Sequence, residues 1–400
     1  MSTPSESFFD TRWGRVGGAL LSLALLAAVA IWLYYPSLDD AMRSFDDQAW
    51  LRDTTVRNSF VTMFDPRVRS ANPFSTTYYL PLQSALFWVM VELFGRSAQA
   101  FHVLCLGIHV VASGLVYMLC RALTRNPWVA LVAGLLFVGH LGHVQSVTWV
   151  SATVSHPLVT VFIVGTMLAW VRYLETRRRV YYGVALGSLV VGLLIRESAV
   201  IVPVLMALLE GAFALRAHPQ RALKEHMARA GRALVKYAPF VLVAAPIVAI
   251  SVYKYPRGSL HQKWGGVSLG VHPLLRLLDF SSLLVYPVRQ SASLKLGLAG
   301  GLILLGWCLF YVFRRRPLWT FCLLWIGIGL APYTLSNFNE ARHIMRYLYP
   351  ASVGYVLLLA LWCTSAVERA GTRRWPKLVA FGLFVAYTLW HLYKLYQRMY

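Results

Sequence analysis

The sequence predicts an all-α polytopic membrane protein, because it is rich in apolar residues and these are grouped in long runs. Of its 400 residues, 58% are hydrophobic and 14% are charged, whereas a soluble domain averages about 25% charged residues. The first uncharged run, residues 17–35, is long enough to cross a hydrocarbon core of about 30 Å. Similar runs recur to the end of the chain, so we expect about 11 transmembrane helices.

Hydropathy places these helices along the whole chain. We expect them at 15–35, 98–120, 127–143, 155–171, 180–195, 198–215, 236–253, 296–313, 317–335, 346–366 and 377–396. A further apolar piece, 271–288, carries Arg276 and Asp279, and we expect a buried or interfacial helix there rather than a span. The first run is an uncleaved span, because it is too long for a signal peptide and no small-residue cleavage site follows it.

The distribution of charge predicts which loops face the cytoplasm. With the N-terminus inside, more than half of the 38 Lys and Arg residues fall in inside segments that are much shorter than the outside loops, as the positive-inside rule requires. Most of the 16 acidic residues fall outside. The net charge of +22 is therefore a signal of topology and of contact with membrane lipids. It does not indicate nucleic-acid binding.

Two outer loops are long enough to hold structure of their own. In the first loop, 36–97, the apolar residues of FDDQAWLRDTTVRNSFVTMF recur near helical spacing. We expect amphipathic helices on the outer membrane face there, followed by a return into the membrane region at 78–95. The second large loop, 254–295, contains six basic residues. We expect a single transmembrane domain over 1–400 with no separate soluble domain.

Polar and ionisable side chains gather on the outer side of this topology. Asp46 and Asp47 lie about ten residues beyond the first span. Four other outside-facing stretches carry polar groups at the membrane edge, namely 139–156, 193–200, 254–270 and 337–350. Ionisable residues at such depths are costly and usually face a cavity or a partner. The five stretches together predict one outward-opening site.

Several of these residues also have simpler explanations, which the sequence leaves open. The aspartate pair could be solvated beside a helix start, and Arg196 and Glu197 could form a helix-end salt bridge. His140 and His143 could ligate a metal, but no third ligand lies nearby, and they could equally cap a helix end or bond across helices. The five cysteines are not at metal-ligand spacings.

The motifs also follow an order that is known from one group of enzymes. The aspartate pair precedes YLPL at 79–82, FHVLCLGIHVVASGLVYML, HLGHVQSVTWVS, RESAVIVP and RYLYPASVG. This order, over about residues 40–360, resembles the GT-C membrane glycosyltransferases, and most closely the branch related to the TPR-containing transmembrane O-mannosyltransferases. The chain departs from that pattern at HLGH, where H-P-V-H is usual, at Arg196, where lysine is usual, and at Leu80, where an arginine is common. No repeat domain follows the last span, so we expect no acceptor capture by such a domain in cis.

The resemblance implies transfer of a sugar from a polyprenyl-phosphate carrier to an acceptor on the non-cytoplasmic face. It implies Asp46 as the general base, with Asp47 orienting it or holding the acceptor, and the choice between the two acids stays open. For the donor phosphate it favours Arg342, His343 and Arg346, followed by Arg196 and Lys263. For the sugar or acceptor pocket we expect His140, His143, His156, Glu197 and Tyr79.

The remaining expectations concern partners and alternatives. No cofactor is required, and no metal is indicated, although the resemblance leaves room for a divalent cation. The expected acceptor is a protein hydroxyl, a glycan or a lipid. Because no soluble domain is expected in this chain, we also allow for a membrane or periplasmic partner protein. We expect the bacterial inner membrane, with the active site on the periplasmic face. A lipid-linked glycan ligase or polymerase remains an alternative because of the basic 254–295 loop, as does a lipid or glycan transporter, although no internal repeat is visible.

Overall fold

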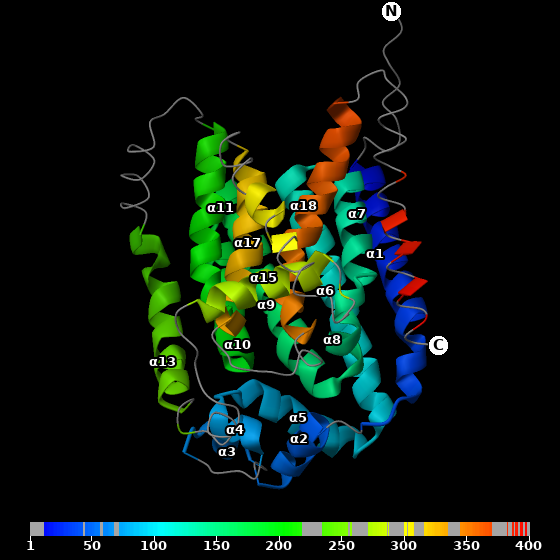
Figure 1. Ribbon diagram of the computed structural model, residues 1–400. Coiled ribbons are helices and arrows are strands. Elements are labelled where there is room, and N and C mark those ends of the chain that lie inside the picture. The colour runs from blue at the N-terminus through cyan, green and yellow to red at the C-terminus, as the bar shows by residue number, and fades with distance from the viewer. Residues whose placement is uncertain are drawn as a thin grey trace, which may run out of the picture.

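A computed structural model of the chain shows a helical bundle closed at one end by a layer of shorter helices (Figure 1). The structure describes residues 12–42, 45–56, 59–67, 72–217, 234–254, 271–285, 316–334 and 345–369, together with isolated residues and short pieces elsewhere. Within these residues all regular structure is helical. The all-α membrane architecture expected from the composition is confirmed.

The upright helices of the bundle match most of the expected spans. They are α1 (Arg12–Tyr34), α6 (Ala98–Thr124), α7 (Pro127–Val138), α9 (Val150–Thr176), α10 (Arg179–Ile195), α11 (Val202–Ala217), α13 (Ala238–Lys254), α17 (Pro317–Thr334) and α18 (Leu348–Arg369). Among the described residues, seven helices are long and apolar enough to cross a membrane, or eight if α7 and the bent segment Leu141–Thr148 form one span. The expected number of about 11 is not confirmed, and the spans expected at 296–313 and 377–396 lie largely outside the described residues.

Small residues allow α17 and α18 to pack closely. A Cβ atom added to Gly354 would lie 2.6 Å from the carbonyl oxygen of Cys322, and one added to Gly329 would lie 3.0 Å from Cα of Ala351. Close backbone approach through small residues is a common way for membrane helices to associate. Trp325 adds a hydrogen bond across the same contact, because its Nε1 donates to the carbonyl oxygen of Pro350 at 2.9 Å.

The turn between α6 and α7 is specified locally. Arg125 ends α6 in the left-handed region, with φ of 58°, and Asn126 begins α7 as its N-cap. The Asn126 Oδ1 accepts the N–H groups of Trp128 and Val129 at 2.9 and 3.3 Å, and Pro127 occupies the first helical position. An N-cap followed by proline is a strong start signal, so the reversal is short and Arg125 stays at the helix end.

The first outer loop folds as a layer across one end of the bundle, seen at the bottom of Figure 1. It contains α2 (Phe45–Val56), α3 (Phe60–Phe64), α4 (Pro73–Thr77) and α5 (Pro81–Phe94). Buried Trp50 stacks on Phe87 of α5 at 5.6 Å, and both belong to an apolar cluster that includes residues of α6 and α9. The stretch 78–95, which is expected to enter the membrane region again, contains α5, a short apolar helix of 14 residues in this layer.

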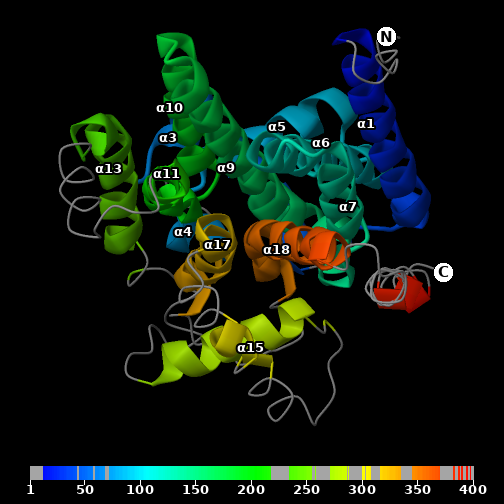
Figure 2. The ribbon, with the colours of Figure 1, turned by 90° about the horizontal axis from the view of Figure 1, so that it is seen from above.

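The apolar piece at 271–288 forms α15 (His272–Val285), which runs across α17 and α18 (Figure 2). Phe280 and Leu284 are buried, whereas Leu274 and Leu275 are exposed. Arg276 and Asp279 pair with each other at 3.9 Å. A helix that is buried on one side and carries an ion pair agrees with the expectation of a buried or interfacial segment.

Candidate active site

Asp46 lies in the first turn of α2 and pairs with Arg346, which precedes α18. The Arg346 Nη1 donates to Asp46 Oδ2 at 2.7 Å, although the two residues are 300 positions apart. The Asp46 side chain is 17% exposed and the Arg346 side chain is 14% exposed, so the pair is largely withdrawn from solvent. The aspartate of the outer layer and a basic residue of the late RYLYP motif therefore meet at one point.

Asp47 points to a different place and has a different partner. Its side chain is 3% exposed, and its Oδ1 accepts the backbone N–H of Ser151 at 2.8 Å. Ser151 is the second residue of α9, so the carboxylate lies against the positive end of that helix. Asp47 thereby ties α2 to the bundle, while its neighbour Asp46 faces Arg346.

Arg346 is held from several directions. Its backbone N–H donates to Oε1 of Gln145 at 3.2 Å, and its carbonyl oxygen accepts the Ser146 hydroxyl at 3.4 Å. Its guanidinium carbon lies 5.6 Å from the ring centre of Trp149 and 5.4 Å from that of Tyr347. The Nε atom is buried and has no hydrogen-bond partner among the described residues, so one fixed donor is left to serve a ligand.

Arg196 forms a second cationic point between α10 and the short helix Glu197–Ile201. Its Nη1 donates to the hydroxyl of Ser155, and its guanidinium carbon lies 5.6 Å from the ring of Tyr78 and 6.0 Å from that of Tyr333. Burial lowers the pKa of Arg196, but the Glu197 carboxylate and the surrounding tyrosines outweigh it, so the pKa is raised and the guanidinium stays charged. Within the described structure its Nε atom is also buried without a hydrogen bond.

Aromatic rings connect the two arginines. Tyr333 stacks on Tyr347 with centroids 4.7 Å apart, and His156 meets both rings edge-on at 5.5 and 5.0 Å. The Tyr333 hydroxyl and His156 Nδ1 are 3.3 Å apart. Arg196, His156, Tyr333, Tyr347 and Arg346 thus form one continuous set with Asp46 at its end. Two charged guanidinium groups can bind an anion, and the Asp46 carboxylate beside Arg346 can accept a proton.

Other residues expected at the site lie apart from this set. The Tyr79 hydroxyl donates to the carbonyl oxygen of Phe64, so Tyr79 points into the outer layer. His140 caps the turn Leu141–His143 by accepting the Gly142 N–H and contacts the carbonyl oxygen of Leu284 at 2.9 Å. His143 lies 2.8 Å from the Ser352 hydroxyl, inside the bundle core. These contacts match the capping and cross-helix alternatives, and a pocket role for both histidines stays a prediction.

Three further candidates, Arg342, His343 and Lys263, lie outside the described residues. The structure adds four residues that the sequence analysis did not select, namely Tyr78, Gln145, Trp149 and Tyr333. All four lie in or next to stretches that were expected to face outward. Their position in or beside these stretches is the feature of the sequence that could have identified them. In the part of the chain that the structure describes, no three His, Cys, Asp or Glu side chains are grouped to hold a metal ion.

Solved structures share this architecture over nearly the whole chain. The archaeal oligosaccharyltransferase AglB from Archaeoglobus fulgidus, in complex with an inhibitory peptide and a dolichol-phosphate, superimposes with a TM-score of 0.55 at 15% identity, covering 98% of this chain and 56% of its own. ArnT from Cupriavidus metallidurans bound to undecaprenyl phosphate gives 0.50 at 14% identity, covering 94% of this chain and 64% of its own. The chain has the GT-C glycosyltransferase fold. It spans between half and two thirds of the length of these GT-C structures.

A sequence model of one family agrees with the GT-C fold. The model for dolichyl-phosphate-mannose-protein mannosyltransferases matches residues 80–246, which is less than half of the chain. No curated protein matches the sequence. The three-dimensional similarity to GT-C structures therefore covers nearly the whole chain. The sequence similarity to the family model is confined to residues 80–246, between α5 and α13.

Proposed function

We propose that this GT-C protein transfers a sugar from a polyprenyl-phosphate carrier to a hydroxyl acceptor on the non-cytoplasmic face of the membrane. The observation that carries the proposal is the pair of buried guanidinium groups, Arg346 and Arg196, each with an Nε donor that no described residue satisfies. A buried donor without a partner is costly. A phosphate between the two arginines would supply the missing acceptors.

Similar folds support the same chemistry. AglB and ArnT were both solved with a polyprenyl-type phosphate bound, and AglB was also solved with a tethered acceptor peptide. A lipid-linked phosphate carries the negative charge that the two arginines complement, and an isoprenoid tail can remain in the bilayer. The donor class is therefore inferred from the site and the fold together, and the sugar is left open.

In the proposed reaction, Asp46 is the general base. The acceptor oxygen forms a bond to the anomeric carbon of the sugar while the bond from that carbon to the phosphate oxygen breaks. The proton of the acceptor hydroxyl passes to Asp46, and the electron pair of the broken bond leaves with the polyprenyl phosphate. Arg346 and Arg196 stabilise the negative charge that grows on the phosphate in the transition state.

The contact between Asp46 and Arg346 suits this sequence of events. The two groups neutralise each other at 2.7 Å. An arriving phosphate competes for the Arg346 donors and leaves the Asp46 carboxylate turned toward the acceptor. Asp47, held on the N–H of Ser151, is proposed to position α2 so that Asp46 reaches the site.

The proposal is tested with the purified protein in lipid nanodiscs and radiolabelled polyprenyl-phosphate sugars, with transfer to peptide, glycan and lipid acceptors as the readout. We expect covalent transfer by the natural chain and a loss of about 10²–10⁴-fold in Asp46→Asn, as for other general bases. Asp65→Asn is a matched control, because Asp65 belongs to the same layer but pairs with exposed Arg67.

Two results would contradict the proposal. Full transfer by Asp46→Asn would remove the assigned base. Movement of the labelled lipid across the membrane without any covalent product, by protein that binds the donor, would assign the chain to the transporters instead.

A further inference from the structure

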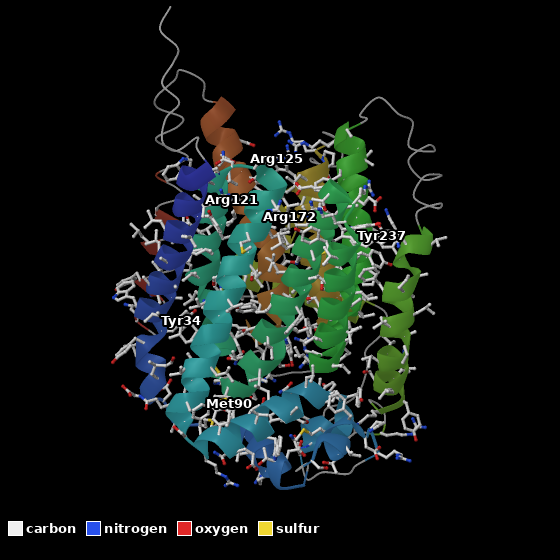
Figure 3. All side chains as sticks on the ribbon, turned by 180° about the vertical axis from the view of Figure 1, so that it is seen from behind. Tyr34, Met90, Arg121, Arg125, Arg172 and Tyr237 are labelled. Carbon is white, nitrogen blue, oxygen red and sulfur yellow. The ribbon has the colours of Figure 1, made fainter. Side chains whose placement is uncertain are left out.

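A groove lies at the end of the bundle opposite the α2–α5 layer. It is bounded by α1, α6, α9 and α10 and has a volume of about 980 Å³, which is as large as typical ligand sites of about 300–1,000 Å³. Figure 3 shows three residues of its lining, Arg121, Arg125 and Arg172, toward this end, with Met90 in the opposite layer. None of the lining residues belongs to the candidate active site, so the groove needs an explanation of its own.

The groove is basic at one end and apolar along its walls. Arg121 on α6 and Arg172 on α9 mark the basic end, whereas Leu115 and Gly165 on the same helices line the groove farther from this end of the bundle. At 1.5 Å per residue, the apolar wall reaches about 9–10 Å below the arginines. Leu23 of α1 contributes the facing side. This polarity matches a lipid, with a headgroup at the membrane surface and a chain pointing toward the midplane.

The groove opens toward the bilayer. Met118 and Val184 both line it and are 42% and 53% exposed. Each belongs to an apolar helix, α6 or α10, and the exposed apolar side chains of a membrane-spanning bundle face acyl chains. A ligand can therefore enter sideways from the membrane without crossing water.

The charges at the mouth are arranged to bind an anion. Glu175 pairs with Arg172 at 3.1 Å and with Arg125 at 3.9 Å, and Arg121 Nη1 donates to the Tyr117 hydroxyl at 3.3 Å. Arg125 and Arg172 share the one carboxylate of Glu175, so these three residues have an excess of one positive charge. Because each guanidinium has five N–H donors, the shared Glu175 carboxylate leaves donors of Arg125 and Arg172 for phosphate oxygens. The positive-inside rule explains basic residues at this end, but it does not explain why these three converge on an apolar groove.

We propose that the groove binds an anionic phospholipid of the cytoplasmic leaflet. The phosphodiester lies against Arg125 and Arg172, with Arg121 at its inner side, and one acyl chain follows the wall between α6 and α9. Guanidinium forks bind phosphate oxygens in pairs, and the positive excess favours an anionic headgroup over a zwitterionic one. The site is independent of sugar transfer, because it uses no residue of the proposed reaction.

Native mass spectrometry of the purified full chain tests this assignment. The protein is titrated separately with dioleoyl-phosphatidylglycerol, dioleoyl-phosphatidylcholine and undecaprenyl phosphate. We expect phosphatidylglycerol to bind about tenfold more tightly than phosphatidylcholine. In the triple variant R121Q/R125Q/R172Q we expect that preference to disappear.

A matched control removes the same charge outside the groove. Arg177, Arg178 and Arg179 are exposed at the same end and are absent from the lining, so R177Q/R178Q/R179Q should keep the preference within about twofold. If the groove variant does not fold, R125Q/R172Q retains the contact between Arg121 and Tyr117 and should still lose most of the affinity. Equal weakening in both triple variants, or tighter binding of undecaprenyl phosphate than of phosphatidylglycerol, would overturn the proposal.

Discussion

Asparagine substitutions at Asp46 and Asp47 are expected to have different consequences, although the two residues are adjacent. Both changes keep the size and one oxygen acceptor of the side chain and remove its charge. Asp47→Asn can still accept the Ser151 N–H, so at this contact it loses the interaction of a full charge with the N-terminus of α9. That interaction is worth about 1–2 kcal/mol in a partly buried setting.

The cost of Asp46→Asn to folding should be of similar size. Breaking a fully buried ion pair costs about 3–5 kcal/mol, but the Asp46 and Arg346 side chains keep some exposure. The asparagine oxygen can also still accept the Arg346 N–H. We therefore expect a loss of about 1–2 kcal/mol, and the two variants should differ little in thermal stability.

Sugar transfer should separate the two variants clearly. Per folded molecule, we expect Asp46→Asn to lose about 10²–10⁴-fold in rate and Asp47→Asn to lose less than about tenfold, because it only positions α2. The measurements are thermal unfolding in nanodiscs and single-turnover transfer from labelled donor. An inactive Asp47→Asn with normal stability, beside an active Asp46→Asn, would show that the roles are reversed.

Four further changes test the site and the packing. Arg346→Lys keeps the charge and loses the planar fork, so kcat should fall about 10²-fold; an unchanged kcat would exclude the guanidinium from the reaction. Arg196→Ala should weaken polyprenyl-phosphate binding about tenfold in a titration, and unaltered affinity would exclude it from the donor site. Gly354→Ala places a methyl group 2.6 Å from the Cys322 carbonyl oxygen and should cost about 1–3 kcal/mol; an unaltered Tm would contradict the close contact of α17 and α18. His143→Ala should cost about 2–4 kcal/mol by opening the packed core, whereas normal Tm with impaired transfer would favour a pocket role.

Hydropathy predicted most of the spans, but it misplaced the start of α9. The sequence analysis expected a span at 155–171, whereas the helix begins at Val150. Its first turn is rich in hydroxyl groups, which lower hydropathy. The Thr153 hydroxyl donates to the carbonyl oxygen of Trp149, and Thr160 does the same to His156. Hydroxyls that donate to nearby backbone carbonyl oxygens, as Thr153 and Thr160 do, are compatible with a buried helix, and a hydropathy average does not register this.

The site could be predicted only as a group of outward-facing stretches. Charge counting placed Asp46 and Arg346 on one side, but their contact spans 300 residues and leaves no local pattern. Tyr78 and Tyr79 show a second limit. Tyr78 has extended backbone angles, so neighbouring side chains point in opposite directions. Tyr78 faces Arg196, whereas Tyr79 faces the outer layer. Because the two residues are identical and adjacent, the sequence does not indicate which tyrosine faces the candidate site.

The 300-residue separation of Asp46 and Arg346 also sets an order of biogenesis. At synthesis rates of about 5–20 residues per second, Arg346 emerges about 15–60 s after Asp46. During that interval α2 has been made, but the cation that neutralises Asp46 has not. A chain that stalls before α18 therefore carries the Asp46 carboxylate without its Arg346 partner. The Asp46–Arg346 pair of the candidate site thus forms only after residue 346 has been made.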